Sequence, residues 1–503
     1  MAELTERPFP PGDYPLVLVG SGPGGLQFSY ALRRLGVDHA VVSADPAPGG
    51  MFRRWPFFQR LLSWTKPYSP APQGSRAFER YDWNSLIADE PALRALQVEH
   101  MDGTSDFPSR PAMEANLASF AERAGVRVRY DTRWVSTRRE DEPDGRFVLT
   151  TTDGEYRARV LVFAVGVAEP WRPSTPGMDL VAHYADTRPA ETYAGKRLFI
   201  VGKQNSGFEL ASGLLQWASR IVLASPSPAK LSVNTRSLVG VRARYVQPFE
   251  DHNLGGGVSI LDAAIDSIER AGETYRIHLR RADEATSISF EADEVIAATG
   301  FVTPLLDLPD LGVATFGQSR LPAQTPFWES ATVPGIYFAG TITQGSGGLK
   351  KHGIPANSGA VHGARYNARI LARRIAEEHF SVTTERPRLA RGDVLSFCLD
   401  ELAEAPELWH QRGYLARVIT VSPEEGVLDE GIVPLTTFLD GTGPDGLALT
   451  IEADGTGASY PALYARRSGA IEERLLPSHP LLDFRTAEHR AELTSVLEGI
   501  GIR

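Results

Sequence analysis

Two segments of the chain each read as a buried strand that runs into a glycine-rich turn and then into a helix. In the first, the apolar run Leu16–Val19 precedes glycines at positions 20–25, and in the second, Arg197–Val201 precedes a turn that starts at Gly202. Parallel strands need a crossover connection, usually a helix, so each segment predicts its own doubly wound sheet. Ligands bind such sheets at the carboxyl ends of the strands. The two turns therefore predict an α/β fold with two Rossmann-like dinucleotide-binding domains.

The first turn reads Gly20-Ser21-Gly22-Pro23-Gly24-Gly25 and satisfies the GxGxxG pattern. The first glycine allows the tight turn, the second lets the backbone approach a pyrophosphate, and the third allows close helix packing. The helix start adds free N–H groups and a partial positive charge. An acidic residue is expected about 20 positions on, where it holds the ribose. Here Ser43 stands at that place with Asp45 two positions later, so one of them takes this role or the ribose is held differently.

The second turn reads Gly202-Lys-Gln204-Asn205-Ser206-Gly207-Phe-Glu209, with Gln204 in place of the middle glycine. A side chain there blocks the closest backbone approach, whereas Asn205 and Ser206 at the helix start can still meet a phosphate. The next strand is followed by a group of two hydroxyls and a cation, namely Ser225, Ser227 and Lys230. Hydroxyls and a cation without an acid suit a 2′-phosphate better than a bare ribose, which favours NADPH over NADH.

The rest of the chain predicts how these units are connected. A helix at 113–124 and a strand-rich run at 126–163, turning at 140–145, read as antiparallel strands that complete the first domain. Short apolar strands at 293–300 and 335–340 indicate that the chain returns to it. We expect an FAD-type domain at 1–175 and 301–386, an inserted domain at 176–300, and a C-terminal α+β domain at 387–503. That last domain is predicted from a helix near 393–404, strands across 415–449 and a helix near 488–499.

Composition narrows the possible functions. Cys398 is the single cysteine, which excludes an intramolecular disulfide, a CxxC pair and a cysteine-rich zinc site, and favours a reducing compartment. A formal charge of −10 argues against nucleic acid as a partner. The longest apolar run, Val160–Ala168, is about half a membrane span. We expect a cytoplasmic protein that acts on small molecules, with no metal site and no membrane contact, and a homodimer stays open.

An aromatic block follows the first unit. It begins with Pro48-Gly-Gly50-Met51-Phe52 and continues through Trp64 to Tyr68. Rings near a cofactor can exclude water from its reactive face, and an ordinary aromatic core explains each ring equally well. Lys66 is a polar exception within this block.

The order of these signals resembles the class B flavoprotein monooxygenases, which include flavin-containing monooxygenases, N-hydroxylases and Baeyer–Villiger enzymes. The resemblance also uses Ala164-Val-Gly166, Thr299-Gly300-Phe301 and the run Pro334–Gly340. It implies FAD on the first unit and NADPH on the second. It further implies that one oxygen atom of O2 is transferred to a small molecule through a C4a-(hydro)peroxyflavin.

Departures from the family refine this expectation. The Baeyer–Villiger fingerprint fails around Gly177, and Thr341 stands where the family usually carries Asp after Gly340. His352-Gly353-Ile354, with Arg365 further on, is similar to a segment of the N-hydroxylases whose helix start meets the flavin pyrimidine. Nitrogen is thus the favoured target, in specialised metabolism, and we expect a helix that begins near Ile354. The resemblance leaves Lys66, Asn205 and His352 as catalytic candidates.

Alternatives stay open at this point. Disulfide reductases share the layout but pass electrons to a cysteine pair, which one cysteine cannot form. A flavin oxidase or reductase, or a halogenase that uses a lysine such as Lys66, would need the same cofactors. A non-catalytic nucleotide-binding protein is a further reading, motivated by the degenerate positions Ser43, Gln204 and Thr341.

Overall fold

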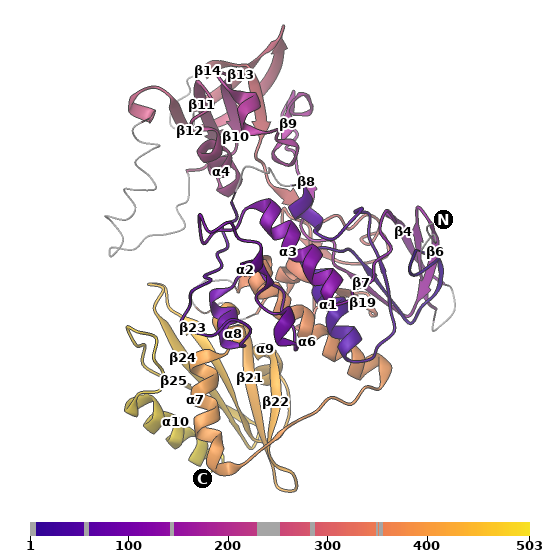
Figure 1. The fold of residues 1–503 in the computed structure, drawn as a ribbon, viewed down its shortest axis with the longest axis vertical. Coiled ribbons are helices and arrows are strands. Elements are labelled where there is room, and N and C mark those ends of the chain that lie inside the picture. The colour runs from indigo at the N-terminus through magenta and orange to yellow at the C-terminus, as the bar shows by residue number, and fades with distance from the viewer. Residues whose placement is uncertain are drawn as a thin grey trace.

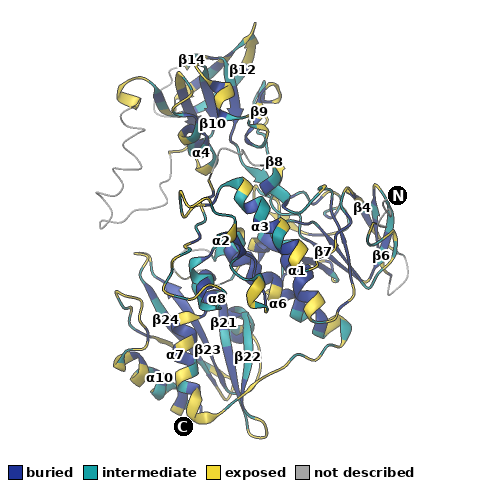
Figure 2. Cartoon of the chain, in the orientation of Figure 1, coloured by how far each residue is buried: buried dark blue, intermediate teal, exposed yellow. Residues whose placement is uncertain are grey.

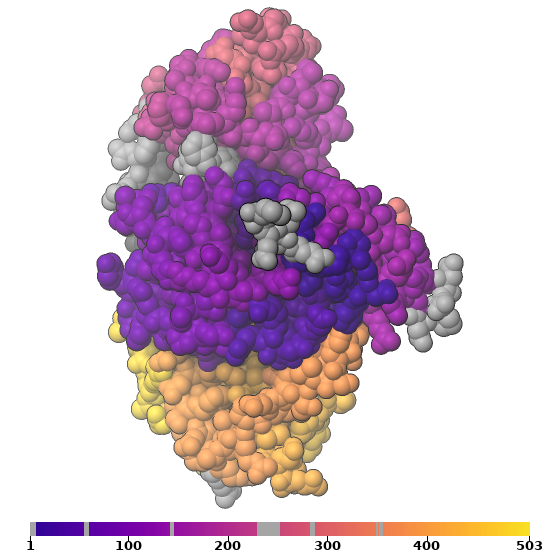
Figure 3. Space-filling view, turned by 45° about the vertical axis from the view of Figure 1, so that its right-hand side comes forward, coloured from indigo at the N-terminus to yellow at the C-terminus, as the bar shows by residue number. Residues whose placement is uncertain are grey.

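The structure is a computed structural model that describes residues 7–54, 60–140, 145–228, 252–281, 287–348, 351 and 356–502. Three sheet-based bodies follow one another along the long axis of the molecule (Figure 1). The first parallel sheet lies in the middle, the second forms one end and the C-terminal sheet forms the other (Figure 3). The predicted fold class, two dinucleotide-binding α/β units with a C-terminal α+β part, is confirmed.

The middle body is built on a parallel sheet of order β19-β7-β2-β3. Its strands are β2 (Leu16–Val19), β3 (Ala40–Val42), β7 (Val160–Phe163) and β19 (Ile336–Phe338). A second sheet, of order β1-β6-β5-β4, contains β1 (Gly12–Asp13), β4 (Trp134–Arg139), β5 (Phe147–Thr151) and β6 (Gly154–Ala158). The expectation that all strands of 126–163 are antiparallel is therefore wrong for β7, since its fully apolar sequence suits the buried centre of a parallel sheet.

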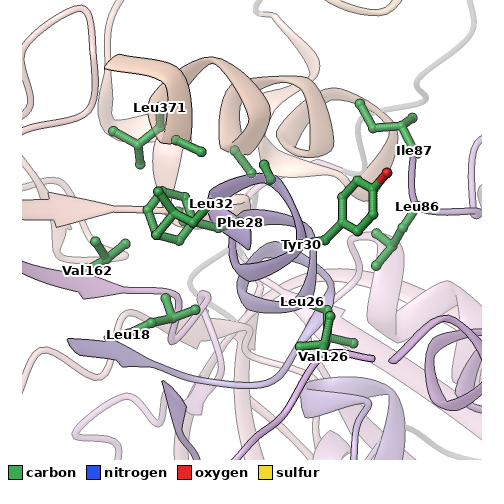
Figure 4. Close-up of a cluster of buried hydrophobic side chains, with 14 of the residues drawn as sticks. Leu18, Leu26, Phe28, Tyr30, Leu32, Leu86, Ile87, Val126, Val162 and Leu371 are labelled. Carbon is green, nitrogen blue, oxygen red and sulfur yellow. The ribbon is translucent and has the colours of Figure 1, made fainter. Parts of the chain in front are cut away.

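Helices cover this sheet and carry its core. They are α1 (Pro23–Arg34), α2 (Leu96–Glu99), α3 (Arg110–Arg123) and α6 (Val361–Phe380). Figure 4 shows Phe28 and Leu32 of α1 between the sheet residues Leu18 and Val162 and Leu371 of α6. Because α1 is enclosed by the sheet on one side and α6 on the other, the glycine turn that precedes it has a fixed position.

The second body has a seven-stranded mixed sheet of order β14-β13-β12-β11-β10-β15-β9. Its strands are β9 (Ala182–His183), β10 (Arg197–Val201), β11 (Arg220–Ser225), β12 (Val258–Ala271), β13 (Thr274–Arg281), β14 (Ser287–Ala292) and β15 (Glu294–Ala297). Helix α4 (Asn205–Leu214) follows β10 and ends at Leu214. The backbone N–H of Ala218 still bonds to the Leu214 carbonyl, so the last turn closes without continuing the helix.

Two short strands join the bodies. The chain leaves the first sheet after β7 through β8 (Glu169–Pro170) and returns after β15 through β16 (Phe301–Val302). These two strands pair antiparallel with each other. The second body is thus connected by two crossing segments, as an inserted unit requires. Residues 303–335 then add β17 (Thr315–Phe316) and β18 (Leu321–Pro322) before β19.

The C-terminal body is a six-stranded sheet of order β20-β22-β21-β23-β24-β25, in which every pairing is antiparallel. It contains β20 (Arg388–Leu389), β21 (Leu415–Ser422), β22 (Gly426–Pro434), β23 (Gly446–Ala453), β24 (Ser459–Arg467) and β25 (Ala470–Leu475), with α7 (Val394–Glu404), α8 (Pro406–His410), α9 (Leu435–Asp440) and α10 (Ala487–Gly499). Figure 2 shows its central strands buried. The predicted helices α7 and α10 are present, while β24 and β25 were not expected.

Neither a membrane-spanning helix nor a metal-binding cluster occurs among the residues that the structure describes. Every helix there is too short or too polar to cross a bilayer. Among the same residues, no cluster of three or more His, Cys, Asp or Glu side chains has an arrangement that could hold a metal ion.

Candidate functional site

The glycines of the first turn differ in how closely other backbone atoms approach them. Gly20 has φ 113°, and a Cβ there would lie 2.6 Å from the Ala164 carbonyl oxygen. A Cβ on Gly24 would lie 2.2 Å from Gly340 Cα, and one on Gly25 would lie 2.1 Å from the Gly20 oxygen. A Cβ on Gly22 would meet nothing closer than 3.8 Å. Three glycines are therefore needed for close packing, whereas a Cβ on Gly22 would make only an ordinary van der Waals contact with Gly50.

The start of α1 suits an anion. No side chain caps it, its first turn holds no acidic residue, and Pro23 occupies the first helical position. Free N–H groups at such an end attract phosphate. The residues present therefore fit the pyrophosphate of a dinucleotide, with Gly22 next to the helix start.

Ser43 and Asp45 lie just beyond β3, next to this turn. Ser21 Oγ donates to Ser43 Oγ at 2.8 Å, and the Asp45 backbone N–H bonds to the same oxygen at 3.2 Å. The Asp45 carboxylate is 3.3 Å from the guanidinium of Arg54. The predicted ribose contact stays a prediction, and Asp45 would have to share its charge with Arg54.

Two further predicted segments gather at the same turn. A Cβ on Gly50 would lie 3.0 Å from Gly22 Cα, so the block that continues with Met51 and the buried Phe52 folds back over the turn. A Cβ on Gly166 would lie 3.7 Å from Thr341 Oγ1. The carboxyl ends of β2, β7 and β19 therefore bring the separate glycine motifs of the first body together.

The helix expected near Ile354 begins later. Helix α6 starts at Val361, preceded by the short helix η9 (Asn357–Gly359), and His352, Gly353 and Ile354 lie outside the described residues. The difference has a local cause, because the N–H of Ala364 bonds to the Ala360 carbonyl, which makes Ala360 the start of the helical ladder.

His362, in the first turn of α6, was not predicted from the sequence. It is 5% exposed, and neither ring nitrogen has a hydrogen-bond partner among the described residues. Its ring stacks on Trp83 at 4.2 Å and meets the edge of His410 at 5.1 Å. Burial, aided by the charges of Arg365 and Arg412, lowers the pKa of His362 to about 3, so the ring is neutral. The available signal was a second His-Gly pair at 362–363, which opens the strongly helical stretch.

The other catalytic candidates lie apart from this cluster. Lys66 is exposed, and its backbone N–H bonds to the Tyr81 carbonyl at 2.8 Å. Its neighbour Trp64 packs on Trp83 with ring centroids 5.3 Å apart. Asn205 lies in the second body, at the start of α4, and is also exposed. The structure therefore does not bring Lys66 and Asn205 together with the buried rings.

The second glycine turn repeats the packing of the first. A Cβ on Gly202 would lie 2.4 Å from the Ala298 oxygen, and one on Gly207 would lie 2.5 Å from the Gly202 oxygen. Gln204 is exposed at the N-cap of α4, Ser206 is half-buried, and the first turn holds no acid. This helix start can therefore also receive a phosphate.

Three further residues predicted for the second site are Glu209, Ser225 and Lys230. Tyr184 OH donates to Glu209 Oε2 at 3.0 Å, and burial raises the pKa of Glu209. Ser225 Oγ donates to the Ser227 carbonyl at 3.4 Å beyond β11, and Lys230 lies outside the described residues. The expected 2′-phosphate contact stays a prediction.

Thr299 and Gly300 form the junction between the two bodies. Thr299 Oγ1 donates to the Trp171 carbonyl at 2.5 Å, and Trp171 N–H bonds to the Gly300 oxygen at 3.0 Å. His183 Nε2 donates to that same oxygen at 3.0 Å, and burial lowers the pKa of His183. These contacts fix the crossing point of the chain.

Comparison with known proteins places the chain in a family. Residues 17–340 match the family described as pyridine nucleotide-disulphide oxidoreductase. The chain belongs to this family. The family's description names an oxidoreductase and a pyridine nucleotide.

Individual similarities are distant. The chain is 27% identical over 432 residues to the FAD-dependent oxidoreductase domain-containing protein 2 of Mus musculus, covering 80% of this chain and 64% of that protein. A bacillithiol disulfide reductase from Staphylococcus aureus matches 73% of this chain and 99% of its own at 15% identity, with a TM-score of 0.56. An ornithine N-hydroxylase from Kutzneria sp. 744 matches the same shares at 16% identity and a TM-score of 0.54. At these identities the two solved structures show the fold alone.

The sole cysteine lies away from the glycine turns. Cys398 is fully buried in α7, within the apolar core of the C-terminal body. Burial raises the pKa of its thiol, which disfavours the reactive thiolate. A cysteine pair that exchanges electrons with a flavin is therefore absent from this sequence.

Proposed function

We propose that this protein is an NADPH-dependent monooxygenase that transfers one oxygen atom from O2 to a small molecule, with nitrogen the favoured target. The observation that carries the proposal is a family fold for two dinucleotides whose only thiol is buried in another domain. Electrons that enter from NADPH must then leave to O2, to a substrate or to a partner. An ornithine N-hydroxylase and a disulfide reductase share this fold, so it is the single cysteine of this sequence that favours the oxygenase outcome.

The chain's own residues have definable tasks in this proposal. Bound FAD supplies hydride acceptance from NADPH and two-electron reactivity toward O2. Gly22 and the start of α1 bind its pyrophosphate, while the start of α4 binds phosphate of NADPH. No side chain caps the start of α6. The positive end of its helix dipole can therefore stabilise a bound group on which negative charge develops. The half-buried ring of Trp83 and the buried rings of His362 and His410 exclude water near the first turn of α6.

Stoichiometry tests the proposal. Purified protein is supplied with NADPH and a panel of primary amines and hydroxylatable amino acids, and NADPH, O2 and hydrogen peroxide are measured together. An oxygenase consumes NADPH in proportion to oxygenated product and releases little peroxide when a substrate is present. Peroxide equal to NADPH with every compound would instead identify an oxidase or reductase, and product that depends on halide would identify a halogenase.

The cofactor preference is tested in the same assay. NADPH is predicted to support turnover at lower concentration than NADH, because the segment after β11 carries hydroxyls and no acid up to Ser227. A preference for NADH would contradict this part of the proposal.

A further inference from the structure

The C-terminal body contacts the elements that surround the candidate flavin site. Three of its residues, His410, Gln411 and Tyr414, follow one another at the end of α8 and the start of β21, and together they are called the C-terminal anchor. All three are at least nine-tenths buried. They lie against the end of η8 (Gly340–Gly345) and against the start of α6, so this face of the C-terminal sheet is directed at the first body.

Gln411 makes the central contacts of the C-terminal anchor. Its Nε2 donates to Ser358 Oγ at 3.0 Å, to the Gly363 carbonyl at 3.1 Å and to Asn367 Oδ1 at 2.7 Å. The Gly363 carbonyl can only accept, so the amide nitrogen must face this side. One side chain of the C-terminal body thus holds η9 and the first two turns of α6.

These contacts continue to the first glycine turn. Asn367 Nδ2 donates to Thr343 Oγ1 at 2.9 Å, and Thr343 Oγ1 donates to the Gly340 carbonyl at 2.6 Å. Gly340 is the residue whose Cα a Cβ on Gly24 would strike. Gln411, Asn367 and Thr343 are all fully buried. A hydrogen-bonded path therefore joins the C-terminal body to Gly340, which packs against the turn that fits the pyrophosphate.

The chain between η8 and α6 is held from the same side. A Cβ on Gly348 would lie 2.3 Å from the Tyr414 ring, and Trp328 Nε1 donates to the Tyr414 hydroxyl at 2.8 Å. Asn357 Nδ2 donates to the His410 carbonyl at 2.8 Å. Each residue of the C-terminal anchor therefore restrains one described part of this connection.

Lys351 adds a separate attachment farther along the C-terminal sheet. Its Nζ lies 3.3 Å from the buried carboxylate of Glu452 on β23 and 2.5 Å from Tyr464 OH on β24, and it also contacts Glu473 on β25. An ammonium that meets two carboxylates and a hydroxyl is held at a defined point. In sequence Lys351 lies midway between the glycine turn of η8 and the first turn of α6.

Ion pairs keep the two bodies together. Arg76 of the first body meets Glu401 at 2.5 Å and Glu407 at 2.8 Å, and Arg417 meets the same Glu401 at 2.8 Å. An interface held together by apolar burial alone would not need so many buried polar groups. Each such group costs free energy unless it forms well-aligned hydrogen bonds or ion pairs. Buried polar contacts of this kind fix orientation as well as attachment.

We propose that the C-terminal domain is a structural part of the flavin site, and that Gln411 is a positioning residue which sets the first turn of α6 and the η8 turn against the flavin. The inference rests on the proposed FAD binding. It gives the C-terminal domain a role that its sequence did not indicate. It also predicts that the flavin's properties respond to a residue that does not touch the cofactor.

The test measures the flavin itself. Gln411→Met keeps the length of the side chain and removes its donors. FAD affinity, the midpoint potential and the visible absorption spectrum are measured for the wild type and this variant. We expect about tenfold weaker FAD binding, together with a shifted potential and band shape, because the buried acceptors around Gln411 lose its two N–H donors. Gln411→Asn, which keeps an amide but shortens its reach, is expected to recover these properties only in part.

Two further variants make the outcome decisive. Thr420→Val is the matched control, since Thr420 is buried in the same sheet and bonds to Glu430 at 2.7 Å, away from the C-terminal anchor. It is expected to lower thermal stability without changing the flavin. Lys351→Met removes the separate, partly exposed attachment and is expected to shift the potential in the same direction by less. This variant decides the question if Gln411→Met does not fold.

The outcomes are distinguishable from those of the proposed function. Wild-type protein that binds no FAD overturns both proposals. Wild-type protein that binds FAD, with Gln411→Met unchanged in affinity, potential and spectrum, overturns only the positioning role. Where Gln411→Met does not fold, an unchanged Lys351→Met has the same consequence. A loss of thermal stability alone in these variants would likewise reduce the C-terminal anchor to a packing contact.

Discussion

The two glycine turns differ in what they retain. Both keep the glycine that ends the strand and the glycine that packs the helix, at Gly20 and Gly25 in the first and at Gly202 and Gly207 in the second. Only the first keeps the middle glycine, Gly22, whose place Gln204 takes in the second. Packing glycines are therefore required by the fold, whereas the middle position depends on the ligand.

The surroundings of the two turns differ in the same sense. Helix α1 is enclosed by the sheet and α6, while the N-cap and the first residue of α4, Gln204 and Asn205, are exposed. The seventh residue after the first glycine is Gln27 in one unit and Glu209 in the other. Gln27 is fully buried and pairs with both backbone groups of Ile87, at 2.9 and 2.8 Å. These differences support the proposal that the first turn holds a ligand that stays bound and the second a ligand that exchanges.

The largest effect is predicted for Gly24→Ala. The new Cβ would lie 2.2 Å from Gly340 Cα, and backbone on both sides prevents relief. We expect a loss of about 3 kcal/mol in stability together with loss of FAD. Chemical denaturation of the apoprotein checks it. Apoprotein of wild-type stability would show that this close approach is relieved by a small shift of η8.

Gly22→Ala should separate folding from binding. The nearest atom to the new Cβ is 3.8 Å away, so the apoprotein should unfold at nearly the wild-type denaturant concentration. FAD should bind about tenfold more weakly, a cost of about 1.4 kcal/mol, because the methyl group enters the space open to the pyrophosphate. Gly392→Ala, with no atom within 4 Å of its Cβ, is the control. Equal FAD affinity in both variants would contradict the assignment of this turn.

Lys230→Ala tests the second turn. Loss of a cation near the 2′-phosphate should raise KM for NADPH about tenfold and leave KM for NADH unchanged. Steady-state kinetics with both nucleotides provide the comparison, with NADH as the internal control. An equal change in KM for both nucleotides would show that Lys230 does not contact the 2′-phosphate.

The smallest effect is predicted for Glu209→Gln. Burial raises the pKa of Glu209, so its carboxyl favours the protonated form in the folded protein, and the stability this brings is lost as pH rises through the raised pKa. The glutamine variant cannot lose a proton and should be more stable than the wild type, by on the order of 0.5 kcal/mol, only above that pH. Thermal melts of both proteins at pH values below and above the raised pKa of Glu209 test this prediction. A gain in stability of equal size at every pH would exclude the titration of Glu209 as the cause.

The sequence predicted the parts of the fold that depend on local pattern. Apolar runs that end in glycine placed β2, β10 and the starts of α1 and α4, since strand, turn and helix are adjacent in the chain. The missed features depend on contacts between distant residues. His362 acquires its surroundings from Trp83 and His410, and β7 joins a parallel sheet because of its partners. No local pattern encodes such contacts.

The candidate site followed the same division. The first-body glycines gather at one edge as their motifs predicted. The start of α6 lies later than expected, because the expectation rested on the resemblance of His352-Gly353-Ile354 and did not consider the second His-Gly pair at 362–363. The contribution of Gln411 could not be foreseen, since its partners Ser358, Gly363 and Asn367 come from another body.

Anaerobic titration of the purified protein with NADPH tests the central claim most directly. If FAD on the first unit receives hydride from NADPH on the second, the visible flavin band bleaches as NADPH is added. Admission of O2 alone, without any disulfide, then restores it. Protein that holds FAD but keeps its colour under NADPH, or regains it only when a disulfide is supplied, would contradict the account.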